Sequence, residues 1–285
     1  MANARPLPAP APELSLPELA EALQQAGSVM VLTGAGVSTH SGIPDYRDHA
    51  GAWKRRAPMQ FSEFVGSERG RQRYWARSLV GWRTVEQAQP NTAHQALAAL
   101  EQRGQVTQLV TQNVDGLHQQ AGSQQVIDLH GRLDRVECLD CGRVMPRQQH
   151  QLALEAMNPD WVNVVNAGAA APDGDADLQA VDYAHFKVPA CTACGGLLKP
   201  AVVFFGENVP AERVAQVRLL LAQSGALLVV GSSLMVWSGY RFVRAAAAAG
   251  KPVYILGLGV TRGDAEATGR VTMDCCAGLG ALAQP

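Results

Sequence analysis

Residues 28–38 read SVMVLTGAGVS, an apolar run that leads directly into a turn of small residues. The run has about the length of a buried parallel strand. Small residues in the turn let the backbone come close to a ligand, and the N-terminus of a following helix can receive phosphate. The pattern is not a full G-x-G-x-x-G, because Thr39 occupies the third glycine position. The segment therefore indicates either a phosphate-binding loop or a tight strand-to-helix turn.

Similar apolar runs recur along the chain and alternate with stretches of helical periodicity. The expected strands are Ser28–Leu32, Gln108–Val110, Val126–Leu129, Val202–Phe205, Ala226–Val230 and Pro252–Leu256. The expected helices are Leu16–Gln25, Ala93–Arg103 and Arg213–Gln223. This alternation predicts an α/β fold with a doubly wound, Rossmann-like parallel sheet.

Two C-x-x-C pairs interrupt this rhythm. They consist of Cys138, Cys141, Cys191 and Cys194, and the interval between them holds a polar segment at 166–177 that we expect to be a loop. Four thiolates fit a closed, tetrahedral zinc site with no open position for chemistry. The 49 residues between Cys141 and Cys191 exceed the usual ribbon spacing of roughly 15–20, so an insertion must loop out. A redox role for either pair is the alternative.

The length and composition set the domain organisation. A chain of 285 residues, 47% apolar, can form one large domain and a small module. We expect a disordered lead-in at 1–13, a Rossmann-like domain at 14–134 and 198–285, and an inserted zinc-binding module at 135–197.

The charge balance and the hydropathy narrow the class of partner. A formal net charge of −1 gives no overall attraction to nucleic acid, a membrane surface or a polyanion. No stretch approaches the roughly 20 apolar residues that span a bilayer, and the N-terminus lacks the apolar core of a signal peptide. We therefore expect a cytoplasmic protein with reduced thiols, and no nucleic acid or membrane as partner.

Polar side chains gather where two expected strands end, the place where open α/β sheets bind ligands. Residues 111–118 read TQNVDGLH, and their carboxamides, carboxylate and imidazole suit ribose hydroxyls and a water, although we expect His118 to be structural. His130 and Gly131 follow the next run. A neutral imidazole, with an ordinary pKa of about 6.5, accepts a proton near pH 7. His130 is therefore a candidate base, with a structural histidine as the alternative.

The segment at 42–47, GIPDYR, sets a rigid turn beside an acid, an aromatic ring and a guanidinium. Such a trio is suited to clamp a cofactor. On these residues alone the ordinary interpretation, an Asp–Arg ion pair beside a buried tyrosine, is the better one.

In this order the motifs resemble those of the sirtuin family. The matching segments are Gly34–Ser38, Gly42–Arg47, Thr111–Asp115, His130 with Gly131, both cysteine pairs, Lys199–Glu207 and Gly231–Leu234. The resemblance extends from about Glu18 to the C-terminus, and 71–82 with 238–241 resembles the class II branch. It implies an NAD-dependent protein-lysine deacetylase or deacylase that consumes NAD, transfers the acyl group to ADP-ribose and releases nicotinamide.

The resemblance also implies roles for individual residues. His130 would be the general base acting on the ribose hydroxyls, Asn113 would position ribose or water, and Asp115 would help hold the nicotinamide end. The four cysteines would hold one structural zinc. The implied NAD-binding residues are Gly34, Ala35, Gly36, Val37, Ser38, Thr39, Gly42, Ile43, Pro44, Asp45, Tyr46, Arg47, Gln112, Asn113, Val114, Asp115, Gly231, Ser232, Ser233, Gly257, Leu258, Gly259 and Cys275, the last with a packed small hydrophobe as the alternative.

Two segments resemble the edges between which sirtuins pair an acyl-lysine peptide. Backbone pairing explains tolerance of many sequences around the lysine. The implied contacts are Val203, Phe204, Phe205, Gly206, Glu207, Leu234 and Val236. We add one hypothesis: Tyr74 and Arg77 share a helix face in the Y-x-x-R spacing with which class III sirtuins hold acidic acyl groups, so succinyl- or glutaryl-lysine is accepted. The favoured alternative is an arginine-rich, solvated helix.

One departure from the family pattern concerns NAD. Gly257 stands where many sirtuins have an asparagine that meets the adenosine ribose, so we expect weaker NAD affinity. Two other functions stay open: an NAD-dependent protein ADP-ribosyltransferase, which shares the NAD site, and a non-catalytic NAD-binding or zinc-ribbon interaction module. The presence of both Asn113 and His130 argues against the non-catalytic module.

Overall fold

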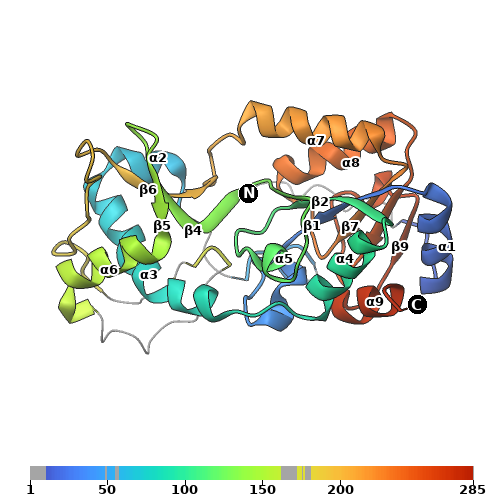
Figure 1. Cartoon of the computed structure of the whole chain (residues 1–285), viewed down its shortest axis with the longest axis horizontal. Helices are drawn as coiled ribbons and strands as arrows, with labels where there is room; N and C mark the ends of the chain where they lie inside the picture. Colours follow the sequence, from blue (N-terminus) through green and yellow to red (C-terminus); the bar gives the residue numbers. More distant parts are fainter. Residues whose placement is uncertain are drawn as a thin grey trace, which may run out of the picture.

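The chain folds into a large and a small lobe that lie side by side (Figure 1). The computed structural model describes residues 11–48, 50–54, 58–161, 172–174, 176 and 181–284. The large lobe contains a six-stranded sheet of order β3-β2-β1-β7-β8-β9, and the small lobe a three-stranded sheet of order β5-β4-β6. The predicted α/β class and Rossmann-like sheet are confirmed. Most of the loop predicted at 166–177 lies outside the described residues.

Every strand of the large sheet is parallel to its neighbours. The strands are β1 (Val29–Thr33), β2 (Val106–Thr111), β3 (Val126–Asp128), β7 (Ala226–Val230), β8 (Val253–Leu256) and β9 (Gly269–Val271). Five of them lie on or within two residues of expected runs. Strand β9 was not predicted, because its three residues, Gly-Arg-Val, form no apolar run.

Helices cover both faces of the large sheet (Figure 1). Alternate residues of a strand point to opposite faces, so Val29 and Val31 belong to one apolar core and Met30 and Leu32 to another. The first core is closed by α1 (Leu16–Ala26), α4 (Thr92–Gln102) and α9 (Cys275–Leu282), and the second by α7 (Ala211–Gln223) and α8 (Trp237–Ala248).

Local capping fixes where these helices begin. At α1 the Ser15 hydroxyl accepts from the Glu18 amide, and the Glu18 carboxylate accepts from the Ser15 amide, a capping box. Asn91 caps α4 and Asp274 caps α9 with their side-chain oxygens. These caps satisfy backbone amides that have no partner within the helix.

The small lobe packs its sheet against α2 (Phe61–Gly66), α3 (Glu68–Gln87) and α6 (Arg147–Met157). Its strands are β4 (Gly131–Cys138), β5 (Val144–Pro146) and β6 (Leu198–Val202), and both pairings are antiparallel. The prediction of a parallel strand at 202–205 is wrong. That strand, β6, begins earlier, at Leu198, and pairs with β4 in the small lobe instead of joining the large sheet. An apolar run does not specify this choice of partner.

The beginning of the chain contacts the last strand of the large sheet. Residues 1–10 of the predicted lead-in lie outside the described residues. Next to them, the Pro12 carbonyl accepts from the Arg270 amide at 2.8 Å, and the Glu13 carboxylate accepts from the Thr272 amide at 2.8 Å. No helix in the described part of the chain is long and apolar enough to cross a membrane.

Candidate active site

A cavity of about 660 Å³ opens where β1, β2, β7 and β8 end, and the small lobe forms its other wall. Most of the predicted NAD-binding residues line it, together with the predicted peptide segment 203–207. Val37, Gly42, Pro44, Leu234 and Arg77 do not line it. The predicted site residues thus come together from eight separate places in the chain, most of them at the carboxyl ends of parallel strands, where open α/β sheets bind ligands.

The glycine-rich turn after β1 is packed tightly against the end of β7. A Cβ on Gly36 would lie 2.8 Å from the Gly231 carbonyl oxygen, and a Cβ on Gly34 would lie 2.7 Å from the Ser232 Cβ. The Gly36 amide donates to that carbonyl at 2.8 Å. Val37 is fully buried in the core instead of facing the cavity. The glycines are therefore required by this close approach, and the turn also borders the cavity.

The segment at 42–47 does not form the Asp–Arg ion pair of the ordinary interpretation. Asp45 pairs with Lys54 instead. The Arg47 guanidinium lies 3.9 Å from the centre of the Trp53 ring and donates to the Gly51 carbonyl at 2.7 Å. These contacts tie 45–48 to 51–54 beside the cavity, and Tyr46 packs edge-on against Trp53.

Ser38 connects the glycine-rich turn to the end of β2. Its hydroxyl donates to Asp115 Oδ2 at 2.7 Å and accepts from Asn113 Nδ2 at 3.0 Å. Asp115 Oδ1 accepts from the Leu117 amide at 2.9 Å. This network fixes the carboxamide and the carboxylate where both line the cavity.

Two buried histidines stand behind this network. His94 Nε2 lies 3.4 Å from the Ser38 hydroxyl, and His118 Nε2 lies 3.0 Å from the Thr33 hydroxyl. Burial lowers the pKa of His118 well below its ordinary value, so its ring is neutral and structural, as expected. The contribution of His94 was not predicted, because a histidine on the apolar face of a helix resembles any core residue. Its one signal is Asn91 three residues earlier, with which it forms a capping box.

His130 lies half-buried at the end of β3 and has a defined tautomer. Its Nδ1 lies 2.9 Å from the Gln112 carbonyl oxygen, which can only accept, so Nδ1 carries the proton. Its Nε2 lies 2.7 Å from the Ser238 hydroxyl and is left as an acceptor. Burial lowers the pKa of His130 to about 4, and the Arg213 and Arg241 charges add to the effect. The ring is therefore a neutral base at physiological pH, with its basic lone pair at Nε2, where it accepts from the Ser238 hydroxyl.

Gly131, next to His130, has a required conformation. Its φ is +79°, and a Cβ there would collide with the Ala201 carbonyl oxygen. Ser238 and Arg241, both on α8, also line the cavity beside the imidazole. Neither residue was predicted to act here, since nothing local in the sequence connects α8 to His130.

The segment after β6 forms the wall that faces His130. Val203–Glu207 all line the cavity, and the Val203 amide donates to the His130 carbonyl at 2.8 Å. Glu207 is structural as well: its carboxylate accepts from the Phe204 amide at 2.8 Å and pairs with Lys199 at 3.4 Å. Across the cavity Val236 lines the wall, whereas Leu234 is buried, with a φ of +56°.

The far end of the cavity is formed by Gly231–Ser233, Gly257–Gly259 and Cys275. Arg270, from β9, holds this end in place by donating from Nη2 to the carbonyls of Gly257 and Gly259 at 3.3 and 3.0 Å. The role of Arg270 was not predicted, because the strand that carries it was not.

Tyr74 and Arg77 do not converge on the cavity. Tyr74 is buried and lines it, but the Arg77 Nε donates to the Ala176 carbonyl at 2.6 Å. Arg77 is also half-buried rather than solvated. The contact ties α3 to the segment at 176, which neither interpretation of the Y-x-x-R spacing predicts.

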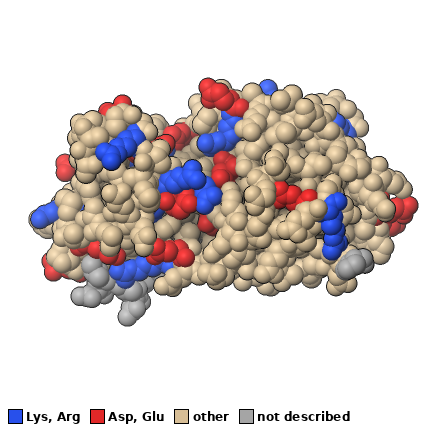
Figure 2. Space-filling model, viewed as in Figure 1, with Lys and Arg blue, Asp and Glu red and all other residues tan. Residues whose placement is uncertain are grey.

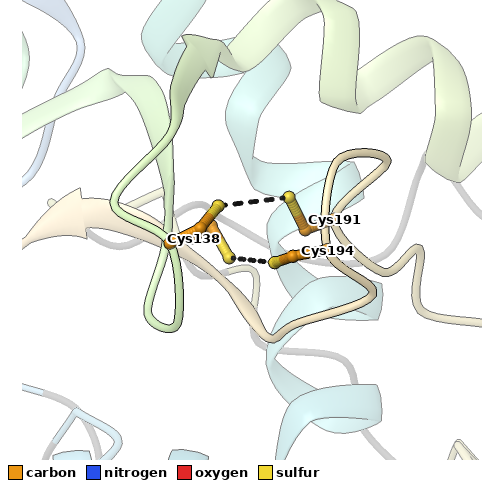
Figure 3. A group of neighbouring side chains, drawn as sticks. Cys138, Cys191 and Cys194 are labelled. Atoms are coloured by element: carbon orange, nitrogen blue, oxygen red, sulfur yellow. Dashed lines mark hydrogen bonds between the residues drawn. The ribbon is translucent and has the colours of Figure 1, made fainter.

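The four cysteines of the two pairs meet in the small lobe, and Figure 3 labels three of them, Cys138, Cys191 and Cys194. Their sulfur atoms all lie within 4.8 Å of one another, with Cys138 and Cys194 at 3.5 Å and Cys141 and Cys191 at 3.8 Å. Tetrahedral zinc with Zn–S bonds of about 2.3 Å separates its ligands by about 3.8 Å. Backbone amides of Ala193 and Cys194 lower the pKa of Cys191 to about 7, which favours the thiolate. The cluster fits zinc, and the four thiols are not in disulfides.

A Rossmann-like lobe with a strand-end cavity and an inserted four-cysteine module defines a nucleotide-binding protein with a zinc ribbon. A family model described as the Sir2 family matches residues 34–238. An NAD-dependent protein deacetylase of Xanthomonas campestris pv. campestris (strain 8004) is 57% identical over 94% of this chain and 91% of its own length. One of Bordetella bronchiseptica is 58% identical over 87% and 89%. The chain belongs to the Sir2 family, as the motifs predicted.

A solved structure of the same family resembles this chain at a lower sequence identity. A Sir2 mutant bound to a deacetylated p53 peptide and 3'-O-acetyl-ADP-ribose superposes with a TM-score of 0.73. It is 29% identical, and the match covers 93% of this chain and 95% of that one. The resemblance is therefore to a protein solved together with an acetylated ADP-ribose and a deacetylated peptide.

Proposed function

We propose that this chain is an NAD-dependent protein-lysine deacetylase, with His130 as its general base. The observation that carries the proposal is the tautomer of His130: Nδ1 is fixed by the Gln112 carbonyl, and Nε2 is left as an acceptor inside the cavity. A pKa of about 4 keeps that acceptor unprotonated at pH 7. The relatives named NAD-dependent protein deacetylase support the same activity.

The two halves of the cavity divide the substrates between them. NAD enters the end formed by the β1 turn and the β7 and β8 ends, where glycines allow close approach of a pyrophosphate. The acyl-lysine peptide lies between 203–207 and 233–237. His130 stands between the two, so its Nε2 would accept the proton of a ribose hydroxyl of bound NAD. Asn113 and Asp115, which are held through Ser38, would orient that ribose.

The zinc site lies away from this chemistry. A closed four-thiolate site leaves no position for substrate. Its role is to hold the hairpin of β4 and β5 to the chain before β6, whose continuation forms the peptide wall. We further propose that the protein acts in the cytoplasm on acyl-lysine proteins, which its free cysteines support.

The direct test is mass spectrometry of acyl-lysine peptides incubated with the protein, with and without NAD. We expect NAD-dependent loss of the acyl group and formation of O-acyl-ADP-ribose, reduced at least about 100-fold in His130→Ala, the scale of a lost general base. His185→Ala, an exposed histidine of the small lobe, is the matched control and should retain wild-type activity.

The product identifies the reaction. ADP-ribosylated protein with unmodified peptides would replace the deacetylase by an ADP-ribosyltransferase, which shares the NAD site. NAD binding without any product would leave a non-catalytic module. Wild-type turnover in His130→Ala would remove the assigned base.

A further inference from the structure

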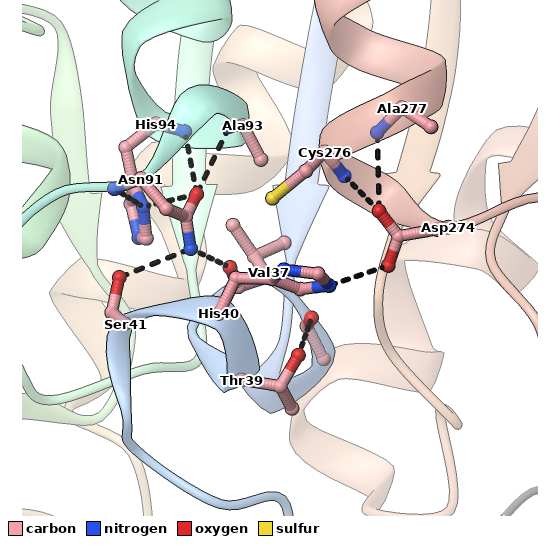
Figure 4. A network of polar contacts seen from close by, with 11 residues as sticks. Val37, Thr39, His40, Ser41, Asn91, Ala93, His94, Asp274, Cys276 and Ala277 are labelled. Carbon is pink, nitrogen blue, oxygen red and sulfur yellow. Dashed lines mark hydrogen bonds and ion pairs between the residues drawn. The ribbon is translucent and has the colours of Figure 1, made fainter.

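A second cluster of metal-binding side chains lies at the rim of the cavity, far from the four cysteines along the chain (Figure 4). It comprises His40 on η2 (Thr39–Ser41), Asp274 at the N-cap of α9, and Cys276 in the first turn of α9. His40 Nε2 lies 3.0 Å from Asp274 Oδ2. One ligand atom of each residue lies within 4.8 Å of the others, the same limit that encloses the four cysteine sulfurs.

The cluster is built so that its carboxylate is already oriented. Asp274 Oδ1 accepts from the backbone amides of Cys276 and Ala277 at 2.9 and 3.1 Å. This cap leaves Oδ2 directed toward His40 (Figure 4). The side chains of His40 and Asp274 are 56% and 35% exposed, so a cation from solvent can reach them.

We propose that His40, Asp274 and Cys276 form a second metal site, for a divalent cation of the zinc class. An imidazole, a carboxylate and a thiolate are all ligands of zinc, with bonds of about 2.0–2.3 Å. The mixture of nitrogen, oxygen and sulfur excludes magnesium and calcium, which take oxygen ligands. A thiolate and a carboxylate together balance the charge of the cation. The thiol proton leaves to solvent when the metal binds.

The site differs from the four-cysteine cluster in strength and in place. Three ligands leave the fourth position to water, and two of the three side chains are open to solvent, so this metal exchanges whereas the ribbon zinc is retained. His40 and Asp274 both line the cavity wall. A bound cation therefore ties η2, directly after the glycine-rich turn, to α9 on the adenosine side, and restricts the loop that begins there.

The first test counts metal ions in the full-length protein. After loading with zinc sulfate and removal of excess, we expect two zinc ions per chain in the wild type. Cys276→Ser and His40→Ala should retain one, with the second site weakened at least about tenfold, the lower limit for loss of even an outer-shell partner. Asp274→Asn keeps the helix cap, since Asn also caps well, and should weaken the site too.

Matched controls separate this site from surface binding. His185→Ala removes an exposed histidine elsewhere and should keep two zinc ions. With cobalt chloride as the probe, the thiolate-to-cobalt absorption of the second ion should be present in the wild type and absent in Cys276→Ser. One zinc ion per chain in the wild type, or two in Cys276→Ser, would overturn the proposal.

Hydrogen exchange tests the proposed link between η2 and α9. Zinc added to protein already loaded at the ribbon should slow amide exchange at 38–42 and 274–278 in the wild type, and leave it unchanged in Cys276→Ser. Slowed exchange in both proteins would place the metal elsewhere. This proposal does not depend on the deacetylase activity, because every measurement is made without NAD or peptide.

Discussion

The two lobes of this protein are held together in different ways. In the large lobe, the sheet is covered on both faces by helices whose buried side chains are nearly all apolar. In the small lobe, a three-stranded sheet shares its interior with cations: Arg147 and Lys199 are each 1% exposed. The large lobe also buries one cation, Arg270, which is 6% exposed and pairs with Asp264. A large core is nevertheless stabilised mainly by apolar burial, whereas a small one needs further constraints.

In the small lobe these further constraints are the contacts of two buried cations, Arg147 and Lys199. The Arg147 guanidinium lies 5.4 and 5.3 Å from the ring centres of Trp75 and Trp82 and donates to the Ser78 carbonyl at 3.3 Å. Lys199 pairs with Glu137 at 3.1 Å. Buried cations that lose one partner are strongly destabilising. The small lobe therefore tolerates few changes, while the large lobe can vary at its loops without losing its sheet.

The largest expected effect is loss of the ribbon zinc from the small lobe. Cys191→Ser removes one thiolate, and zinc binding contributes about 10–16 kcal/mol to folding in zinc-finger peptides. We expect the variant to lose this zinc and its small lobe to unfold, while the large lobe keeps its sheet. Zinc content and thermal unfolding measure this. His185→Ala, an exposed histidine of the small lobe outside the four-sulfur cluster, should keep the melting temperature. Equal melting of wild type and Cys191→Ser would show that the lobes do not differ.

The sequence predicted the large lobe better than the small one for the same physical reason. Apolar runs and the polar residues after them are local signals, so β1, β2, β7, β8 and the ends that carry Asn113 and His130 were placed. The cysteine pairs predicted a module but not its sheet. Lys199, Arg147 and Arg270 escaped prediction, because a charged residue is buried only through partners distant in the sequence. The prediction of a parallel strand at 202–205 was wrong for the same reason, because the pairing of β6 with β4 depends on residues distant in the sequence.

His150, buried in the small lobe, should make the stability of the protein depend on pH. It is 2% exposed, its ring centre lies 4.2 Å from that of Trp75, and burial lowers its pKa to about 3. The unfolded chain binds the proton first as pH falls below about 6.5, so the stability present above that pH is lost progressively toward about pH 3. At about 1.4 kcal/mol per pH unit, the loss between pH 6.5 and 5 is about 2 kcal/mol.

His150→Phe should remove that part of the acid sensitivity. Urea unfolding of wild type and variant at pH 6.5 and pH 5 measures it, as the free energy of unfolding in each protein at each pH. The variant should lose about 2 kcal/mol less than the wild type between the two values. An identical loss in both proteins would mean that His150 titrates normally and that the interior of the small lobe is accessible to water.

His130 in the large lobe is tested by the pH profile of catalysis. Its pKa of about 4 predicts that kcat/KM hardly changes on this account between pH 7 and pH 5.5. A histidine with an ordinary pKa of about 6.5 would lose about tenfold over the same interval. Assays on zinc-loaded protein shown to be folded at both pH values distinguish the two. An acid limb near pH 6.5 would contradict the buried, neutral base.

The smallest expected effect comes from replacing Gly257 by asparagine, the residue that many sirtuins have at this position of the NAD site. A Cβ at Gly257 would lie 3.7 Å from the nearest atom, the Gly231 nitrogen, which is ordinary contact. Gly257→Asn therefore fits, and the family resemblance leads us to expect that its amide would meet the adenosine ribose. One added hydrogen bond contributes about 0.5–1.5 kcal/mol, so the KM for NAD should fall about two- to tenfold with kcat unchanged.

Gly257→Ala distinguishes the effect of the asparagine side-chain amide from the effect of a more restricted backbone. It restricts the chain as asparagine does but offers no hydrogen bond, so its KM for NAD should stay at the wild-type value. An equal fall in both variants would assign the effect to backbone stiffening, and no fall in Gly257→Asn would mean that the loop held by Arg270 already makes the contact through its own carbonyls and amides. Tighter NAD binding by Gly257→Asn would show that a loop of the large lobe can be changed while its core stays intact. Unfolding of the small lobe in Cys191→Ser would show that the core of the small lobe depends on its metal.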